Sequence, residues 1–123
     1  MNFTASNFNN TGICWPLKLK FDHNSSNFEK EYFNFQKKAE LNFKKNITLK
    51  PNLVSTFFDK IAFDENIIKE VKKLIGDDIY IWSSAIFAKP PGTGKMVSYH
   101  QDNPYWQLTT EKVVTAWIAL TNS

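Results

Sequence analysis

The sequence MVSYHQDNPYW, residues 96–106, joins a predicted β-strand to two side chains suited to binding a metal ion. Residues 96–100 are predicted to form a strand, which Asn103-Pro104 ends. Residues i and i+2 of a strand share a face, so a bend at its end can bring His100 and Asp102 toward one point. An imidazole and a carboxylate are two of the three ligands of the facial triad that holds non-haem Fe(II). The pattern His-x-Asp alone is also typical of an ordinary surface strand.

A long amphipathic helix is predicted well upstream of this motif. Ser26-Asn27-Phe28-Glu29 matches a capping box, which marks a helix start. Apolar residues then recur at spacings of three and four, as expected for one buried helix face. They are Phe28, Tyr32, Phe35, Ala39 and Phe43. This stripe indicates core packing.

Two further helices are predicted before residue 77. A short one follows Pro51-Asn52, with Val54, Phe57 or Phe58, and Ile61 on its apolar face. The next begins after Asp64, a suitable N-cap, and ends at Gly76, where a left-handed residue is favoured. Its apolar face comprises Ile67, Val71, Leu74 and Ile75.

The pattern changes from helix to strand after Asp77-Asp78. Strands are predicted over residues 79–88, 96–100 and 113–120, the last apolar on both faces and therefore buried on both. The fold class expected is α+β, within one domain over residues 1–123. We divide it into a leader and entry segment (1–24, with residues 1–12 a loose leader), a helical part (25–76) and the first strands of a sheet (77–123). Because the chain stops three residues after its strongest strand signal, we expect a truncated domain.

Composition excludes several classes of protein. A length of 123 residues fits one globular domain, and no apolar run approaches the roughly 18 to 20 residues that span a membrane. The net charge of +3 comes from dispersed lysines, which argues against nucleic-acid binding. The absence of a signal-peptide pattern and the single cysteine, Cys14, favour the cytoplasm, where thiols stay reduced.

A glycine-rich segment, Pro90-Pro91-Gly92-Thr93-Gly94-Lys95, invites comparison with the phosphate-binding loop of ATPases. The first glycine of that pattern falls on Lys89 and its magnesium-binding hydroxyl falls on Met96, so two required positions are wrong. A turn between two strands is the better interpretation, and nucleotide binding remains a weak alternative.

Several segments taken together resemble the phytanoyl-CoA dioxygenase family of Fe(II)- and 2-oxoglutarate-dependent oxygenases. The resemblance covers about two thirds of the chain and is most specific from residue 69 to residue 120. It rests on Lys89-Pro90-Pro91, residues 97–102, Tyr105-Trp106 and residues 113–120, with weaker similarity at residues 12–19, 74–79 and 82–84. It implies a double-stranded β-helix, a jelly-roll barrel backed by the N-terminal helices.

The same resemblance implies roles for individual residues. His100 and Asp102 would bind Fe(II), while Lys89 and Trp117 would contact the cosubstrate 2-oxoglutarate. The remaining coordination positions would take 2-oxoglutarate and O2. Tyr105 and Trp106 would line the substrate pocket, although core packing is an alternative role for these two and for Trp117. Because halogenating relatives carry a small residue in place of the carboxylate, Asp102 favours hydroxylation of a small organic or acyl substrate.

The chain also departs from the family pattern. The family's distal histidine and its 2-oxoglutarate-binding arginine should follow the His-x-Asp segment, yet the chain has no arginine. The other histidine, His23, precedes the motif in a polar segment and is expected on the surface. We therefore expect an N-terminal portion of an oxygenase, inactive and poorly soluble alone. A non-catalytic jelly-roll binding protein or remnant, and a plain α+β domain, are the alternatives.

Overall fold

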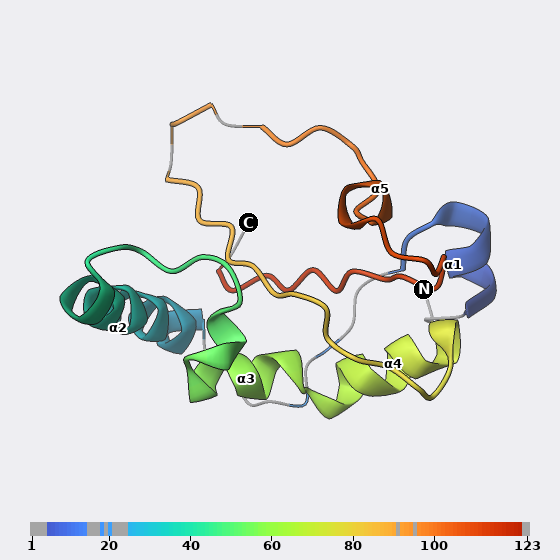
Figure 1. Cartoon of the computed structure of the whole chain (residues 1–123), viewed down its shortest axis with the longest axis horizontal. Coiled ribbons are helices and arrows are strands. Elements are labelled where there is room, and N and C mark those ends of the chain that lie inside the picture. Colours follow the sequence, from blue (N-terminus) through green and yellow to red (C-terminus); the bar gives the residue numbers. More distant parts are fainter. Residues whose placement is uncertain are drawn as a thin grey trace.

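The computed structural model describes residues 5–14, 18, 20, 25–90, 92–94 and 96–121. This part forms the helices α1 (Ala5–Thr11), α2 (Ser25–Phe43), η1 (Pro51–Leu53), α3 (Thr56–Ala62), α4 (Glu65–Ile75) and α5 (Asn103–Trp106). Figure 1 shows α2, α3 and α4 along one side of the molecule and α5 on the opposite side. The red C-terminal segment runs between these two sides. None of the described helices is long and apolar enough to cross a membrane.

The core lies between α2 and α3. The apolar stripe that the sequence predicts on the long helix, observed as α2, packs there. Phe28 is almost completely buried and joins Phe58 and Ile61 in one cluster. The rings of Phe28 and Phe57 meet edge to face with centroids 5.2 Å apart, a favoured aromatic geometry. Ile86, Ile118 and Leu120 pack on the same cluster from distant parts of the chain. The core therefore fixes two segments that flank the predicted site.

The helix predicted after Asp64 is present as α4. The buried Asp64 carboxylate accepts hydrogen bonds from the backbone amides of Asn66 (3.0 Å) and Ile67 (3.4 Å), as an N-cap does. Gly76 ends the helix with φ of 102°, a value that residues with a Cβ rarely adopt.

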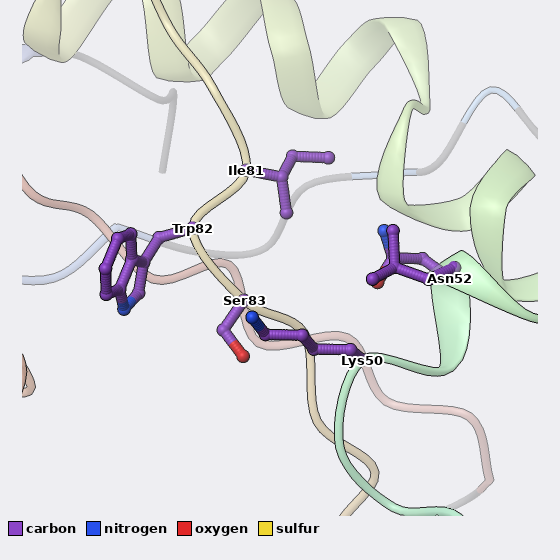
Figure 2. Close-up of a pocket in the computed structure, with 6 residues that line it drawn as sticks. Lys50, Asn52, Ile81, Trp82 and Ser83 are labelled. Carbon is purple, nitrogen blue, oxygen red and sulfur yellow. The ribbon is translucent and has the colours of Figure 1, made fainter.

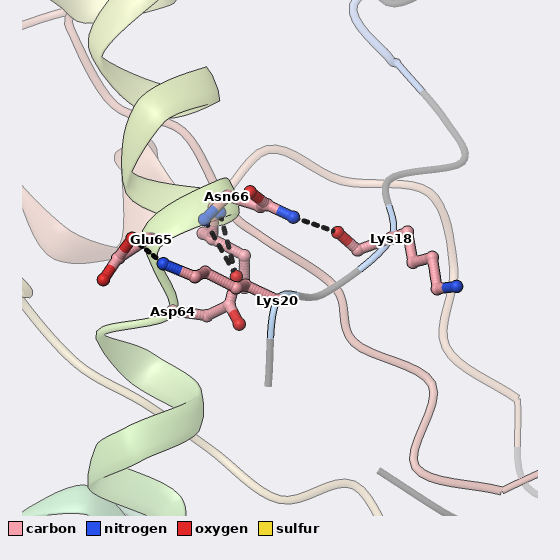
Figure 3. Close-up of polar contacts among 6 residues, drawn as sticks. Lys18, Lys20, Asp64, Glu65 and Asn66 are labelled. Carbon is pink, nitrogen blue, oxygen red and sulfur yellow. Dashed lines mark hydrogen bonds and ion pairs between the residues drawn. The ribbon is translucent and has the colours of Figure 1, made fainter. Parts of the chain in front are cut away.

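The first turn of α4 also holds the entry segment in place. The Asn66 side chain donates a hydrogen bond to the Lys18 carbonyl (2.8 Å), and Lys20 forms an ion pair with Glu65 (Figure 3). The side chains of Lys20 and Glu65 are largely exposed, so their ion pair contributes at most about 1 kcal/mol. The Asn66 contact fixes Lys18 more specifically, because it reaches the backbone.

The predicted strands and the jelly-roll barrel are not observed, so the expected α+β class is wrong for the described residues. Residues 79–90, 96–102 and 113–121 contain no strand, and the described part has one isolated antiparallel bridge, between Leu49 and Ala85. Alternation in a sequence predicts which side chains share a face, but a strand forms only when its backbone pairs with a neighbour. Figure 1 shows residues 96–100 (orange) well away from residues 113–120 (red), so these segments cannot pair.

Two local expectations also need correction. The polar leader over residues 1–12 contains helix α1, whose end is closed by hydrogen bonds from Gly12 to Phe8 (2.7 Å) and from Thr11 to Asn7 (2.7 Å). Residues 113–120 are not buried on both faces, since Trp117 is 93% exposed. Only Ile118 and Leu120 of this segment pack on the core cluster.

Candidate functional site

His100 and Asp102 lie next to each other at the point where an extended segment turns into α5. The His100 Nε2 atom is 3.3 Å from the Asp102 Oδ1 atom. Asp102 is the N-cap of α5, and its carbonyl accepts a hydrogen bond from the Tyr105 amide (3.0 Å). The spacing i, i+2 and the turn at Asn103-Pro104 thus bring both side chains to one point, as predicted, without a strand to carry them.

The imidazole of His100 is oriented by the backbone just before it. Its Nδ1 atom lies 2.8 Å from the Ser98 carbonyl oxygen. A carbonyl oxygen can only accept a hydrogen bond, so Nδ1 carries the proton and, in the neutral ring, Nε2 presents a lone pair. A hydrogen bond of this kind commonly orients a metal-binding histidine.

The carboxylate of Asp102 is oriented in a similar way. The Thr115 hydroxyl donates a hydrogen bond of 2.6 Å to Asp102 Oδ2, which leaves Oδ1 facing the imidazole. In the neutral form of the ring, Nε2 and Oδ1 are two acceptors that face each other at 3.3 Å. A metal ion with two such ligands at about 2.1 Å and at right angles separates them by about 3 Å. The pair fits a divalent cation, and an imidazolium–carboxylate ion pair is the other state that satisfies both atoms.

The site is open to solvent on one side. The His100 and Asp102 side chains are 39% and 28% exposed. The neighbouring Asn103 Oδ1 atom is buried and has no hydrogen-bond partner among the described residues, so the surroundings of the pair contain a further free acceptor. Within the described part, no group of three or more His, Cys, Asp or Glu side chains could hold a metal ion. His23 lies outside the described residues.

The other predicted site residues are placed at different distances from this pair. Tyr105 stands edge-on to His100, with ring centroids 6.0 Å apart and planes at 90°, while its own side chain is mostly exposed. Trp106 is half-buried in α5. Lys89 and Trp117 are exposed, and no contact found among the described residues joins either of them to His100 or Asp102. The structure thus brings the Tyr105 ring next to His100, whereas the described residues show no contact of Lys89 or Trp117 with His100 or Asp102.

Residues 92–94 of the glycine-rich segment lie at a turn, but the two strands that this turn is predicted to join are not observed among the described residues. Gly92 and Gly94 have φ values of 74° and 60°, and the Thr93 hydroxyl donates to the Pro90 carbonyl (3.0 Å). Residues 96–101 that follow are not helical, so the described part has no helix N-terminus there to face a phosphate. Lys95 lies outside the described residues.

Sequence reasoning missed a small pocket formed by residues close in sequence to the Leu49–Ala85 bridge. Its volume is about 110 Å³, and it is lined by Lys50, Asn52, Leu53, Ile81, Trp82 and Ser83. Figure 2 shows the Lys50 side chain extending toward Ser83. A hydrogen bond from the Ser84 hydroxyl to the Asn52 side chain joins the two segments that line the pocket. No sequence motif marks these residues, because they come from separate segments.

Sequence reasoning also missed Ser98 and Thr115. Ser98 contributes only a backbone carbonyl, which any residue type could supply, and Thr115 is distant in sequence from Asp102.

Comparison with known proteins identifies the family of the chain. No curated protein and no solved structure matches the chain significantly. A protein-family model described as phytanoyl-CoA dioxygenase (PhyH) matches residues 18–123, which includes His100, Asp102 and every other predicted site residue. Because the match covers most of the sequence, the chain belongs to the phytanoyl-CoA dioxygenase (PhyH) family.

Proposed function

We propose that this chain carries two metal ligands, His100 and Asp102, of an Fe(II)- and 2-oxoglutarate-dependent oxygenase. The observation that carries the proposal is the 3.3 Å approach of His100 Nε2 to Asp102 Oδ1. The second ring nitrogen of His100, Nδ1, is hydrogen-bonded to the Ser98 carbonyl. The second carboxylate oxygen of Asp102, Oδ2, accepts a hydrogen bond from the Thr115 hydroxyl. A mixed imidazole and carboxylate set with open positions is typical of non-haem iron oxygenases, and family membership points to the same chemistry.

The remaining predicted residues are assigned to the cosubstrate and the substrate. Bound iron, together with 2-oxoglutarate and O2, supplies the oxidising chemistry for an unactivated C–H bond. We assign Lys89 to attract a carboxylate of 2-oxoglutarate and Trp117 to contact the cosubstrate. Tyr105 and Trp106 line the approach of a small organic or acyl substrate. Because Asp102 keeps a carboxylate at the metal, hydroxylation is the proposed outcome.

Metal binding by the intact chain tests this proposal directly. Mn(II), a spectroscopic substitute for Fe(II), is titrated into the metal-free protein, and free Mn(II) is followed by electron paramagnetic resonance. We expect one site, which 2-oxoglutarate tightens because its keto and carboxylate oxygens can chelate the ion. Glutarate, which lacks the keto group, is the matched control and should leave the affinity unchanged.

Three variants locate the site. His100→Ala and Asp102→Ala should each abolish Mn(II) binding, whereas His23→Ala, which removes the chain's other histidine, should preserve it. Binding that survives both His100→Ala and Asp102→Ala would refute the assignment of the ligands. A site that binds Mn(II) but never responds to 2-oxoglutarate would favour a non-catalytic metal-binding member of the family.

A further inference from the structure

The Asp102 carboxylate is held by a residue that is remote in sequence. The Thr115 hydroxyl, 13 residues away, donates a hydrogen bond of 2.6 Å to Oδ2. The direction of this bond is fixed, because an ionised carboxylate can only accept. Without this bond the Asp102 side chain would be free to populate several χ1 rotamers, and its broad terminal torsion would let the two carboxylate oxygens exchange positions. The bond to Thr115 breaks this equivalence and leaves Oδ1 facing His100 Nε2.

Thr115 is itself anchored on both sides of this contact. Three residues later, Ile118 packs against the core cluster of Phe28, Phe58 and Ile61. On the side of α5, the Asn103 side-chain Nδ2 donates a hydrogen bond to the Thr110 carbonyl (3.2 Å). A threonine also has few χ1 rotamers, since its Cβ is branched. The hydroxyl therefore approaches Asp102 from a segment that is fixed by contacts independent of the carboxylate.

We propose that Thr115 is a positioning residue that makes Asp102 a monodentate metal ligand, with Oδ1 offered to the ion and Oδ2 held away from it. This inference rests on the metal-binding function proposed above. A carboxylate can bind a metal through one oxygen or through both. With Oδ2 occupied by the hydroxyl, Asp102 takes up one coordination position and leaves a neighbouring position for a ligand that arrives from solvent.

Two substitutions separate the hydroxyl from the rest of the side chain. Thr115→Val keeps the shape and the branched Cβ but removes the donor, and Thr115→Ser keeps the donor but removes the methyl group. Thr109→Val makes the same change at an exposed threonine outside the contact and serves as the matched control. Circular dichroism and the backbone amide spectrum establish that each variant retains the fold.

Two readouts are measured for each protein. In Mn(II) titrations, loss of a partner of a metal ligand typically weakens binding about 10- to 100-fold, and we expect this for Thr115→Val. Thr115→Ser and Thr109→Val should stay within about threefold of the parent. In the metal-free protein, three-bond couplings report the χ1 rotamer of Asp102. One rotamer should dominate in the parent and in Thr115→Ser, and the couplings should average in Thr115→Val.

The two readouts keep this inference separate from the proposed function. Unchanged Asp102 couplings in Thr115→Val would overturn the positioning role, whatever the metal affinity. Equal Mn(II) affinity in the parent and in Thr115→Val would overturn its effect on the metal. Failure of the parent protein to bind Mn(II) would refute the proposed function and the metal part of the inference, while the couplings would still decide whether Thr115 orients the carboxylate.

Discussion

Replacing Gln36 with methionine should lower the free energy of unfolding by about 1 to 3 kcal/mol. Gln36 is buried on α2, where its Nε2 donates to the Ile47 carbonyl (2.8 Å) and its Oε1 accepts from the Ile47 amide (3.0 Å). Each such bond contributes about 0.5 to 1.5 kcal/mol net, and both are lost together. Methionine matches glutamine in length and helix propensity, so cavity formation and helix weakening add little.

The effect should reach the segment that leads to Lys89. Beyond Ile47, the Thr48 carbonyl accepts a hydrogen bond from the Ile86 amide (2.8 Å), and the Lys50 amide donates to Ser84 (2.7 Å). These bonds hold residues 84–86 against residues 48–50. Loss of the Gln36 contacts should therefore raise hydrogen exchange at the Ile86 and Lys50 amides, by about tenfold for each 1.4 kcal/mol of local stability lost.

Urea denaturation and native-state hydrogen exchange measure the two effects. The matched control is Lys37→Met, which introduces methionine at the next position of α2, where the side chain is exposed. It should change stability by less than about 0.5 kcal/mol. The reasoning is refuted if the Gln36 variant is as stable as this control. It is also refuted if protection falls equally at the Ile86 amide and throughout α4, because the loss would then be global.

Three further substitutions test the helices and the core by urea denaturation. Phe28→Ala removes the most buried side chain of the core cluster and should cost about 3 to 5 kcal/mol, with a matched Phe33→Ala change at an exposed position of α2 costing far less. Asp64→Ala removes the N-cap of α4 and should cost about 0.5 to 2 kcal/mol, seen also as lower helicity. Lys50→Gly should raise stability by about 0.5 to 1 kcal/mol, because Lys50 has a left-handed backbone with φ of 51°; a loss would mean that its side chain is needed.

The helices could be predicted because their signals are local. The Asp64 N-cap and the Gly76 ending lie within one helix length and are both observed in α4. The stripe on α2 correctly marks Phe28 and Ala39 as buried, yet it also predicts Phe43, which is 55% exposed. Periodicity cannot show where the packing partner of a helix ends. It also gives no warning that polar Gln36 is buried, since its partner is a backbone group.

The strand predictions were wrong because the pairing of one strand with another is not determined by local sequence. Residues 79–88 alternate as a strand should, but within the described residues their backbone pairs with residues 48–50 at a single bridge, which consists of two hydrogen bonds. The composition of a segment limits its side-chain environment and leaves its hydrogen-bonding neighbour undetermined. The exposure of Trp117 has the same origin, because a strand predicted to be buried needs something that covers it.

In the candidate site, too, local features could be predicted from the sequence and contacts between distant residues could not. The closeness of His100 and Asp102 follows from their spacing and the turn at Asn103-Pro104, so it could be predicted without the fold. The orientation of the two groups could not, because Oδ2 is held by Thr115 across a separation of 13 residues.

Packing in the core determines where Thr115 lies relative to Asp102. Phe28, Phe58 and Ile61 hold Ile118, and through the short segment between residues 115 and 118 they set the position of the Thr115 hydroxyl. A substitution that loosens Ile118 should therefore disturb the Asp102 carboxylate before it disturbs His100, whose Nδ1 bond to Ser98 spans only two residues. The two ligands of the proposed metal site thus differ in what maintains them: His100 depends on its own segment, and Asp102 depends on the packing of α2 and α3.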